Sequence, residues 1–192
     1  TIYDEMEYLS RAYRYIAGRI VESEGYNEIL ENLIYSFLVG TFRKEGRAGL
    51  YQKTKAEFNL KKFTIDHFLN NLRAVNISRN EIKINKPIEK LIRSFHKSKY
   101  LFILTNGNVT QQRNKINSLN IPYKTEIIVY YSSSLGKEFE KPNPYFILKI
   151  INDYGLLINQ VIFIGDSDID EKASIDAGID FLPYRDFTKL ID

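Results

Sequence analysis

The 192-residue sequence contains no cysteine and no tryptophan, one methionine and two histidines. A chain without cysteine forms no disulfide bonds and offers no thiolate ligands to a metal. This is typical of a reducing compartment, so we expect a cytoplasmic protein. His67 and His96 have no second histidine or carboxylate at metal-ligand spacing. A metal site built on histidine is therefore not expected.

The sequence also lacks a long hydrophobic run and a strong charge of either sign. No apolar stretch approaches the ~18 residues that span a bilayer, so we expect no membrane association. The formal net charge of +3 gives no reason to expect nucleic acid as a partner. With 44% apolar and 27% charged residues, the composition is that of an ordinary globular protein. The length suits one domain with an insertion, or two small domains.

The first part of the chain has the apolar spacing of helices. Between residue 4 and about residue 44, apolar side chains recur every three or four positions, in two runs that Gly25 separates. Residues 41–62 are more basic and less regular. Thr64 is placed to cap a further helix, and Pro87 is well placed at the first position of another.

Farther along the chain, strand and helix patterns alternate. The sequence predicts strands over 99–104, 126–131, 160–165 and 180–183, and helices over 109–119, 143–154 and 169–177. Such alternation favours an α/β fold with a doubly wound parallel sheet and crossover helices. The helical block is then an insertion. We expect the α/β core in residues 1–5 and 86–192 and a helical cap in residues 6–85.

The most informative stretch runs from Val161 to Asp170. A β-branched and aromatic run ends in Gly165, and two carboxylates, Asp166 and Asp170, follow it four residues apart. Ligands of open α/β sheets bind at the carboxyl ends of the strands, and carboxylates collected there suit a hard cation such as Mg²⁺. Aspartate at a helix N-terminus is also favoured by the helix dipole alone. This stretch by itself leaves both interpretations open.

Two further polar segments are expected at the same edge of the sheet. Thr105, Asn106 and Gly107 follow the apolar run 100–104 and bring a hydroxyl, an amide and a permissive glycine. Lys141 lies at a loop-to-helix junction, where a lysine supplies a mobile positive charge suited to a phosphate or a carboxylate. Each segment alone is weak evidence. Their order and their common position after strands favour one shared site.

The three segments together resemble a known family. A hydroxyl after a strand, then Lys-Pro-x-Pro, then Gly-Asp-Ser-x-x-x-Asp followed by small residues is similar to motifs two, three and four of the haloacid dehalogenase-like hydrolases. The likeness covers about residues 98–183, and Ala177-Gly178 matches the pair that usually closes the last of these helices. The resemblance implies Mg²⁺-dependent hydrolysis of a small phosphorylated metabolite beneath a helical cap.

The resemblance also implies a role for each candidate residue. Thr105 binds the transferred phosphoryl group, assisted by the adjoining backbone of Asn106 and Gly107, and Lys141 neutralises charge on that group and on the nucleophile. Asp166 is a ligand of Mg²⁺, and Asp170 supports the metal site directly or through a neighbour.

The amino end departs from the family pattern. The first motif of the family, Asp-x-Asp-x-Thr, carries the nucleophile and the general acid/base, whereas this chain opens Thr1-Ile2-Tyr3 and has its only methionine at Met6. We expect that the sequence begins inside a longer protein, with a central strand and both aspartates upstream of Thr1. The fragment alone is then expected to be inactive, and a signal peptide stays an open question.

Two other kinds of function stay open at this stage. One is different chemistry on the same fold, either a phosphosugar mutase or a 2-haloacid dehalogenase, although dehalogenases do not use Mg²⁺ and the acidic motif four weighs against them. The other is a catalytically inactive binding or regulatory module. The identity of the substrate and the oligomeric state do not follow from the sequence.

Overall fold

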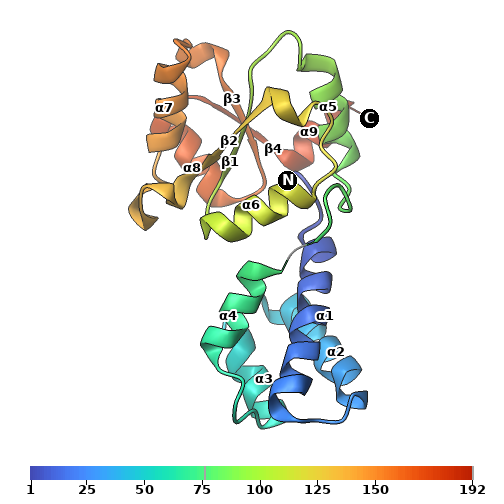
Figure 1. Cartoon of the computed structure of the whole chain (residues 1–192). Coiled ribbons are helices and arrows are strands. Elements are labelled where there is room, and N and C mark those ends of the chain that lie inside the picture. Colours follow the sequence, from blue (N-terminus) through green and yellow to red (C-terminus); the bar gives the residue numbers. More distant parts are fainter. Residues whose placement is uncertain (76, 192) are drawn as a thin grey trace. The chain divides into compact units, whose positions relative to one another are not determined.

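The computed structural model describes residues 1–75 and 77–191, and its contacts divide the chain into two compact units. Residues Glu5–Arg79 form a helical unit, and Thr1–Asp4 together with the chain from Asn80 onward form an α/β unit (Figure 1). The predicted fold class, an α/β core with an inserted helical domain, is thereby confirmed. None of the helices in the described part of the chain combines the length and apolar character that a membrane span requires.

The helical unit contains α1 (Glu5–Glu24), α2 (Ile29–Glu45), α3 (Leu50–Phe58) and α4 (Ile65–Ala74). Helix α1 packs against α2 and α4, and α3 contacts both of these. The face that α1 buries repeats at helical spacing. Its members are Tyr8, Leu9, Ala12, Tyr13, Ile16, Ala17, Ile20 and Val21. The predicted helices on either side of Gly25 are confirmed, whereas α3 was not predicted.

Polar groups hold the connections of the helical unit. The side chain of Thr64 accepts a hydrogen bond from the backbone N–H of His67 at 3.2 Å, which confirms the predicted helix cap. The carboxylate of Glu24 accepts backbone N–H bonds from the consecutive residues 61–63, at 2.7–3.0 Å. Burial alone would raise the pKa of Glu24, but these N–H groups outweigh it and lower the pKa.

The α/β unit alternates strands and helices in the predicted order. Its elements are α5 (Lys86–Phe95), β1 (Leu101–Thr105), α6 (Val109–Ser118), β2 (Ile127–Tyr131), α7 (Tyr145–Asp153), β3 (Ile162–Gly165), α8 (Asp168–Ala177), β4 (Asp180–Pro183) and α9 (Tyr184–Ile191). Each predicted strand and helix of this region is present within a few residues of its expected bounds. Helix α9 was not predicted.

The strands of the α/β unit are parallel, as expected, and those described form two pairs. Leu101 of β1 lies beside Ile127 of β2, and Ile162 of β3 lies beside Asp180 of β4. Helix α8 packs against β3 and β4, and α9 contacts the same two strands. A buried apolar cluster joins these layers. It comprises Ile147, Ala173, Ala177 and Ile179, with Leu104, Ile151, Val161 and Phe163 packed against it.

Two segments outside the helices are tied to the α/β unit by backbone bonds. The N–H of Ile82 donates to the carbonyl of Ser118 at 2.9 Å, and the N–H of Asn120 donates to the carbonyl of Ile82 at 2.8 Å. The N–H of Asn85 donates to the carbonyl of Ile2 at 2.8 Å. The chain that precedes α5 therefore belongs to this unit and also holds the amino-terminal residues.

Candidate functional site

The predicted site residues follow the carboxyl ends of strands in the α/β unit. Thr105 is the last residue of β1, and Asp166 comes directly after the end of β3. Lys141, from the loop before α7, connects the two strand pairs. Its Nζ lies 2.6 Å from Oδ1 of Asp170 and 3.3 Å from the carbonyl oxygen of Leu104. The structure thus brings the end of β1, the loop lysine and the start of α8 together.

The Lys141–Asp170 ion pair is almost closed to solvent, since the two side chains are 10% and 9% exposed. The second carboxylate oxygen of Asp170 accepts a hydrogen bond from Ser167 Oγ at 2.7 Å. Gly165 is required beside this pair, because a Cβ at its position would lie 2.6 Å from Cβ of Asp170. Both oxygens of Asp170 are therefore engaged by the protein itself.

Asp166 has a different environment from Asp170, although both come from the same motif. Its side chain is 53% exposed, and its Oδ2 contacts the amino group of Thr1. Burial alone would raise the pKa of Asp166, but the hydrogen bond and the positive charge of that amino group outweigh it and lower the pKa. One carboxylate is thus half-exposed, and the other is enclosed by an ion pair.

Asn106 joins two of the predicted segments through its side-chain amide. Its Oδ1 accepts a bond from the backbone N–H of Lys141, and its Nδ2 donates to the carbonyl of Lys141, both at 2.9 Å. The fully buried Ser132 lies behind it, with Oγ 2.8 Å from Oδ1 of Asn106 and 3.0 Å from the carbonyl of Thr105. Sequence reasoning gave Ser132 no role. The available signal was its position directly after β2, at the same edge of the sheet.

The remaining predicted donors already have protein acceptors. The hydroxyl of Thr105 donates to Oε1 of Gln112 at 3.0 Å. The N–H of Gly107, whose φ is +100°, lies 3.0 Å from Ser133 Oγ and 3.2 Å from Oε1 of Glu140. Gln112, Ser133 and Glu140 were not predicted, because no motif marks them. When an anion binds here, its oxygens replace these side chains as the acceptors of the Thr105 hydroxyl and the Gly107 N–H.

Of the two carboxylates of the site, only that of Asp166 is suited to bind a hard cation. Among residues 1–75 and 77–191, no three His, Cys, Asp or Glu side chains are close enough to share a metal. Mg²⁺ commonly takes one or two carboxylates and completes its shell with water and phosphate oxygens. The half-exposed carboxylate of Asp166 fits that requirement. Asp170 fits a supporting role, since its oxygens are bonded to Lys141 and Ser167.

Solved structures similar to this chain are hydrolases and related enzymes of one fold. YfnB of Bacillus subtilis, a HAD-hydrolase solved with bound magnesium, is 16% identical, with a TM-score of 0.66 over 99% of this chain and 92% of that one. A Lactobacillus delbrueckii subsp. bulgaricus protein assigned as a phosphoglycolate phosphatase is 12% identical, with a TM-score of 0.56 over 95% and 81%. A Thermotoga maritima protein assigned as a β-phosphoglucomutase is 20% identical, with a TM-score of 0.50 over 93% and 77%. At these identities the likeness establishes the fold.

The family follows from the sequence match. No curated protein sequence matches the chain. A model of the haloacid dehalogenase-like hydrolase family, however, matches residues 1–178, which include the helical unit and all the segments of the site. The resemblance seen in motifs two, three and four is thereby confirmed. The chain belongs to the haloacid dehalogenase-like hydrolases.

Proposed function

We propose that this chain is part of a Mg²⁺-dependent phosphatase that hydrolyses a small phosphate monoester. The observation that supports this most is the position of Lys141, whose ammonium group is held between Asp170 and the end of β1. A fixed positive charge at the edge of the sheet where Thr105 ends β1 and Asp166 follows β3 suits a phosphoryl group. The similarity to a magnesium-bound HAD-hydrolase and to a protein assigned as a phosphatase agrees with this proposal.

In this proposal the residues of the chain bind and orient the phosphoryl group. The hydroxyl of Thr105 turns from Gln112 to a phosphoryl oxygen, and the backbone at Asn106 and Gly107 lies beside that oxygen. Lys141 offsets negative charge as the transferred group moves. Because Asn106 fixes the backbone of Lys141, the donor loop and the lysine keep one geometry. Such preorganised donors lower the barrier without rearranging during the reaction.

We assign different roles to the two aspartates of the motif. Asp166 would hold Mg²⁺, which when bound supplies positive charge to the phosphoryl oxygens. Asp170 would act as a positioning residue, because its carboxylate holds Lys141 and both of its oxygens are occupied. This choice goes beyond the sequence, which allowed Asp170 to support the metal directly or through a neighbour.

We place the nucleophile upstream of Thr1. An aspartate oxygen there would attack phosphorus and form an aspartyl-phosphate, while a second aspartate gives a proton to the leaving alcohol. Water would then hydrolyse the acyl phosphate, with the second aspartate accepting its proton. The contact between the Thr1 amino group and Asp166 supports this placement, since residues joined to Thr1 come close to the carboxyl end of β3.

The test is an assay of a chain extended by its upstream coding sequence, provided that this sequence encodes Asp-x-Asp before Thr1. We expect hydrolysis of p-nitrophenyl phosphate that requires Mg²⁺ and stops with EDTA. Asp166→Asn should lower the rate by about 10²–10³-fold. Asp168→Asn is the matched control, because Asp168 is exposed and should leave the rate almost unchanged. Full activity of Asp166→Asn, or activity that survives chelation, would refute the proposal.

A phosphosugar mutase is the second candidate, supported by the similarity to a protein assigned as a β-phosphoglucomutase. The two functions differ in the fate of the phosphoryl group. A phosphatase releases inorganic phosphate from a sugar phosphate, whereas a mutase returns the group to another hydroxyl. Measuring inorganic phosphate alongside the loss of substrate separates them.

A further inference from the structure

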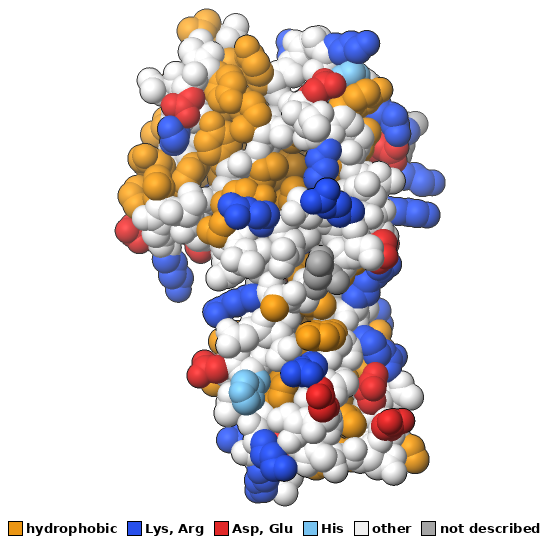
Figure 2. All heavy atoms as spheres, in the orientation of Figure 1, with side chains coloured by type: hydrophobic (Ala, Val, Ile, Leu, Met, Phe, Trp, Pro, Cys, Tyr) orange, Lys and Arg blue, Asp and Glu red, His pale blue; other side chains and the backbone are white. Residues whose placement is uncertain are grey.

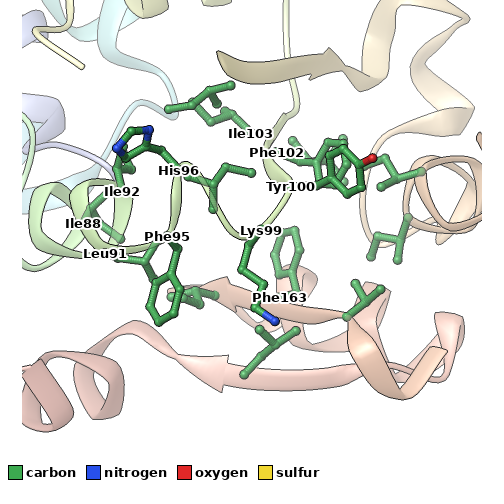
Figure 3. Close-up of a pocket in the computed structure, with 18 of the residues that line it drawn as sticks. Ile88, Leu91, Ile92, Phe95, His96, Lys99, Tyr100, Phe102, Ile103 and Phe163 are labelled. Atoms are coloured by element: carbon green, nitrogen blue, oxygen red, sulfur yellow. The ribbon is translucent and has the colours of Figure 1, made fainter. Parts of the chain in front are cut away.

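The surroundings of β1 are apolar toward β3 and polar toward β2. An apolar cavity of about 1120 Å³ is lined by side chains of β1 and β3, and Figure 3 shows Phe102 and Phe163 around it. Apolar side chains also gather on the face of the α/β unit seen in Figure 2. Toward β2, the loops that follow β1 and β2 bring Gly107, Ser133 and Glu140 together. Polar partners for the part of a substrate that is not transferred are therefore expected toward β2.

Glu140 and its neighbour Lys141 direct their charges to different parts of the site. Oε1 of Glu140 lies 3.2 Å from the backbone N of Gly107 and accepts a hydrogen bond from Ser133 Oγ. The Nζ of Lys141 lies 2.6 Å from Oδ1 of Asp170 at the start of α8. Two adjacent residues thus place a negative charge at the loop after β1 and a positive charge at α8.

The backbone of Glu140 is fixed on both sides of its side chain. Its N–H donates to the carbonyl of Lys137 at 3.1 Å, and its carbonyl accepts from the N–H of Asn143 at 2.9 Å. The next residue, Lys141, is held by the double contact with Asn106. When a phosphoryl oxygen takes the backbone donor of the loop after β1, the carboxylate of Glu140 therefore loses one partner but stays beside the site.

The negative charge of Glu140 is not paired with a cation of the protein. The two motif carboxylates are paired, Asp166 with the amino group of Thr1 and Asp170 with Lys141. Within residues 1–75 and 77–191, Glu140 forms no ion pair with a lysine, an arginine or a histidine. Such a carboxylate attracts a hydrogen-bond donor, most strongly a cationic one, and repels a second anion.

We propose that Glu140 is a specificity-determining residue, which selects phosphate monoesters whose remaining part carries an ammonium or hydroxyl group and no second negative charge. The phosphoryl group would bind at Lys141 and Thr105. The donor on the remaining part would then replace the N–H of Gly107 as a partner of the Glu140 carboxylate. Discrimination of this kind combines an attractive contact for one substrate with a repulsive contact for another. The inference rests on the function proposed above, since it needs a phosphoryl group at Lys141.

The experiment compares phosphate monoesters of similar size that differ in one terminal group. Phosphoethanolamine carries an ammonium, 2-hydroxyethyl phosphate a hydroxyl and phosphoglycolate a carboxylate. Their binding to the 192-residue chain in the presence of Mg²⁺ is measured by NMR, from the shift of the Gly107 amide. We expect the dissociation constants to rise in that order, with a difference of at least about fivefold between the first and the last. Inorganic phosphate, which has no remaining part, reports on the phosphoryl site alone.

Variants at position 140 separate the charge of Glu140 from its structural contacts. Glu140→Gln should reduce the difference between phosphoethanolamine and phosphoglycolate to less than about twofold, because the amide keeps an acceptor oxygen but carries no charge. Glu140→Lys should reverse the order of the two ligands, which a purely structural role would not do. Glu138→Gln is the matched control. Glu138 is an exposed glutamate of the same loop, and its substitution should leave the difference unchanged.

A parent chain that binds phosphoglycolate as tightly as phosphoethanolamine would overturn the proposal, whether or not the variants fold. An unchanged difference in Glu140→Gln would overturn it as well. If inorganic phosphate still binds in either case, the phosphoryl site stands and only the role of Glu140 is wrong. If inorganic phosphate at millimolar concentration does not shift the Gly107 amide, the phosphoryl site is misplaced and the role of Glu140 is refuted with it. The assay of the extended chain then decides the reaction independently.

Discussion

The two units of the chain hold their loops in different ways. In the helical unit, the partly exposed carboxylate of Glu24 accepts the N–H groups of residues 61–63, while an apolar core supplies the packing. In the α/β unit, the site loops depend on the enclosed Lys141–Asp170 pair and on Asn106. When a solvent-exposed polar group loses its protein partner, water can replace that partner. A charge enclosed in the protein has no such replacement. Polar substitutions should therefore be costlier in the α/β unit.

The largest effect is expected from Asp170→Asn, which removes the charge that neutralises Lys141. Breaking an enclosed ion pair from one side typically costs about 3–5 kcal/mol, because the remaining charge is left without compensation. We expect the free energy of unfolding to fall by about 3 kcal/mol, measured by urea denaturation with circular dichroism. Restored stability in the double variant Asp170→Asn with Lys141→Met would show that the lone charge is the cause. A decrease in the free energy of unfolding of less than about 1 kcal/mol would mean that the pair is already solvated by water.

Gly165→Ala and Gly40→Ala should change the free energy of unfolding in opposite directions. At Gly165 the added Cβ meets Asp170, so we expect a loss of about 1–3 kcal/mol. At Gly40, in the interior of α2, nothing lies within 4 Å of an added Cβ, and we expect a gain of about 0.5–1 kcal/mol. Thermal unfolding of both variants beside the parent chain gives the comparison. Equal effects would remove the argument for close packing at the end of β3.

Glu24→Gln should destabilise the helical unit by about 1 kcal/mol at pH 7. The lowered pKa of Glu24 means that its ionised form stabilises the fold above the pKa of the unfolded chain, near 4.3. That contribution is lost as the pH falls through the folded-state pKa. The difference between parent and variant should therefore shrink below about pH 4. Urea denaturation at pH 7, 5 and 3.5 measures it, and a difference independent of pH would contradict this account.

Asp168→Asn should have the smallest effect of all. Asp168 is exposed in the first turn of α8, two residues from each of the site aspartates. Its expected change in unfolding free energy is below about 0.5 kcal/mol, mostly from the interaction with the helix dipole. A large loss of stability in this variant would show that proximity to the motif, and not enclosure, decides the cost of a substitution.

Much of the fold could be predicted because its signals are local. The apolar runs that became β1, β2 and β3, and the cap at Thr64, are visible in the sequence as patterns of a few residues. Helix α3 was missed because its buried face is short and includes Leu50 and Thr54, and the lysines between them obscure the apolar spacing in the sequence. Helix α9 was missed because it begins directly after β4, with no loop between the two elements.

The candidate site was harder to predict in full, because its supporting contacts are long-range. The convergence of Lys141 with Asp170 across 29 positions follows from strand order, but the bonds of Ser132 and Glu140 do not. Serine and glutamate in a polar loop have no spacing that marks them. The opposite environments of Asp166 and Asp170 also appear only in three dimensions, because both occupy equally plausible positions in the motif.

The double contact between Asn106 and Lys141 limits which amino acids can occupy position 106. The side chain must present one acceptor and one donor, at a separation that matches a peptide N–H and its C=O. Aspartate would place a negative oxygen against the carbonyl of Lys141, and glutamine has one methylene too many for the same spacing. A library randomised at position 106 and selected for folding should therefore return asparagine far more often than any other residue.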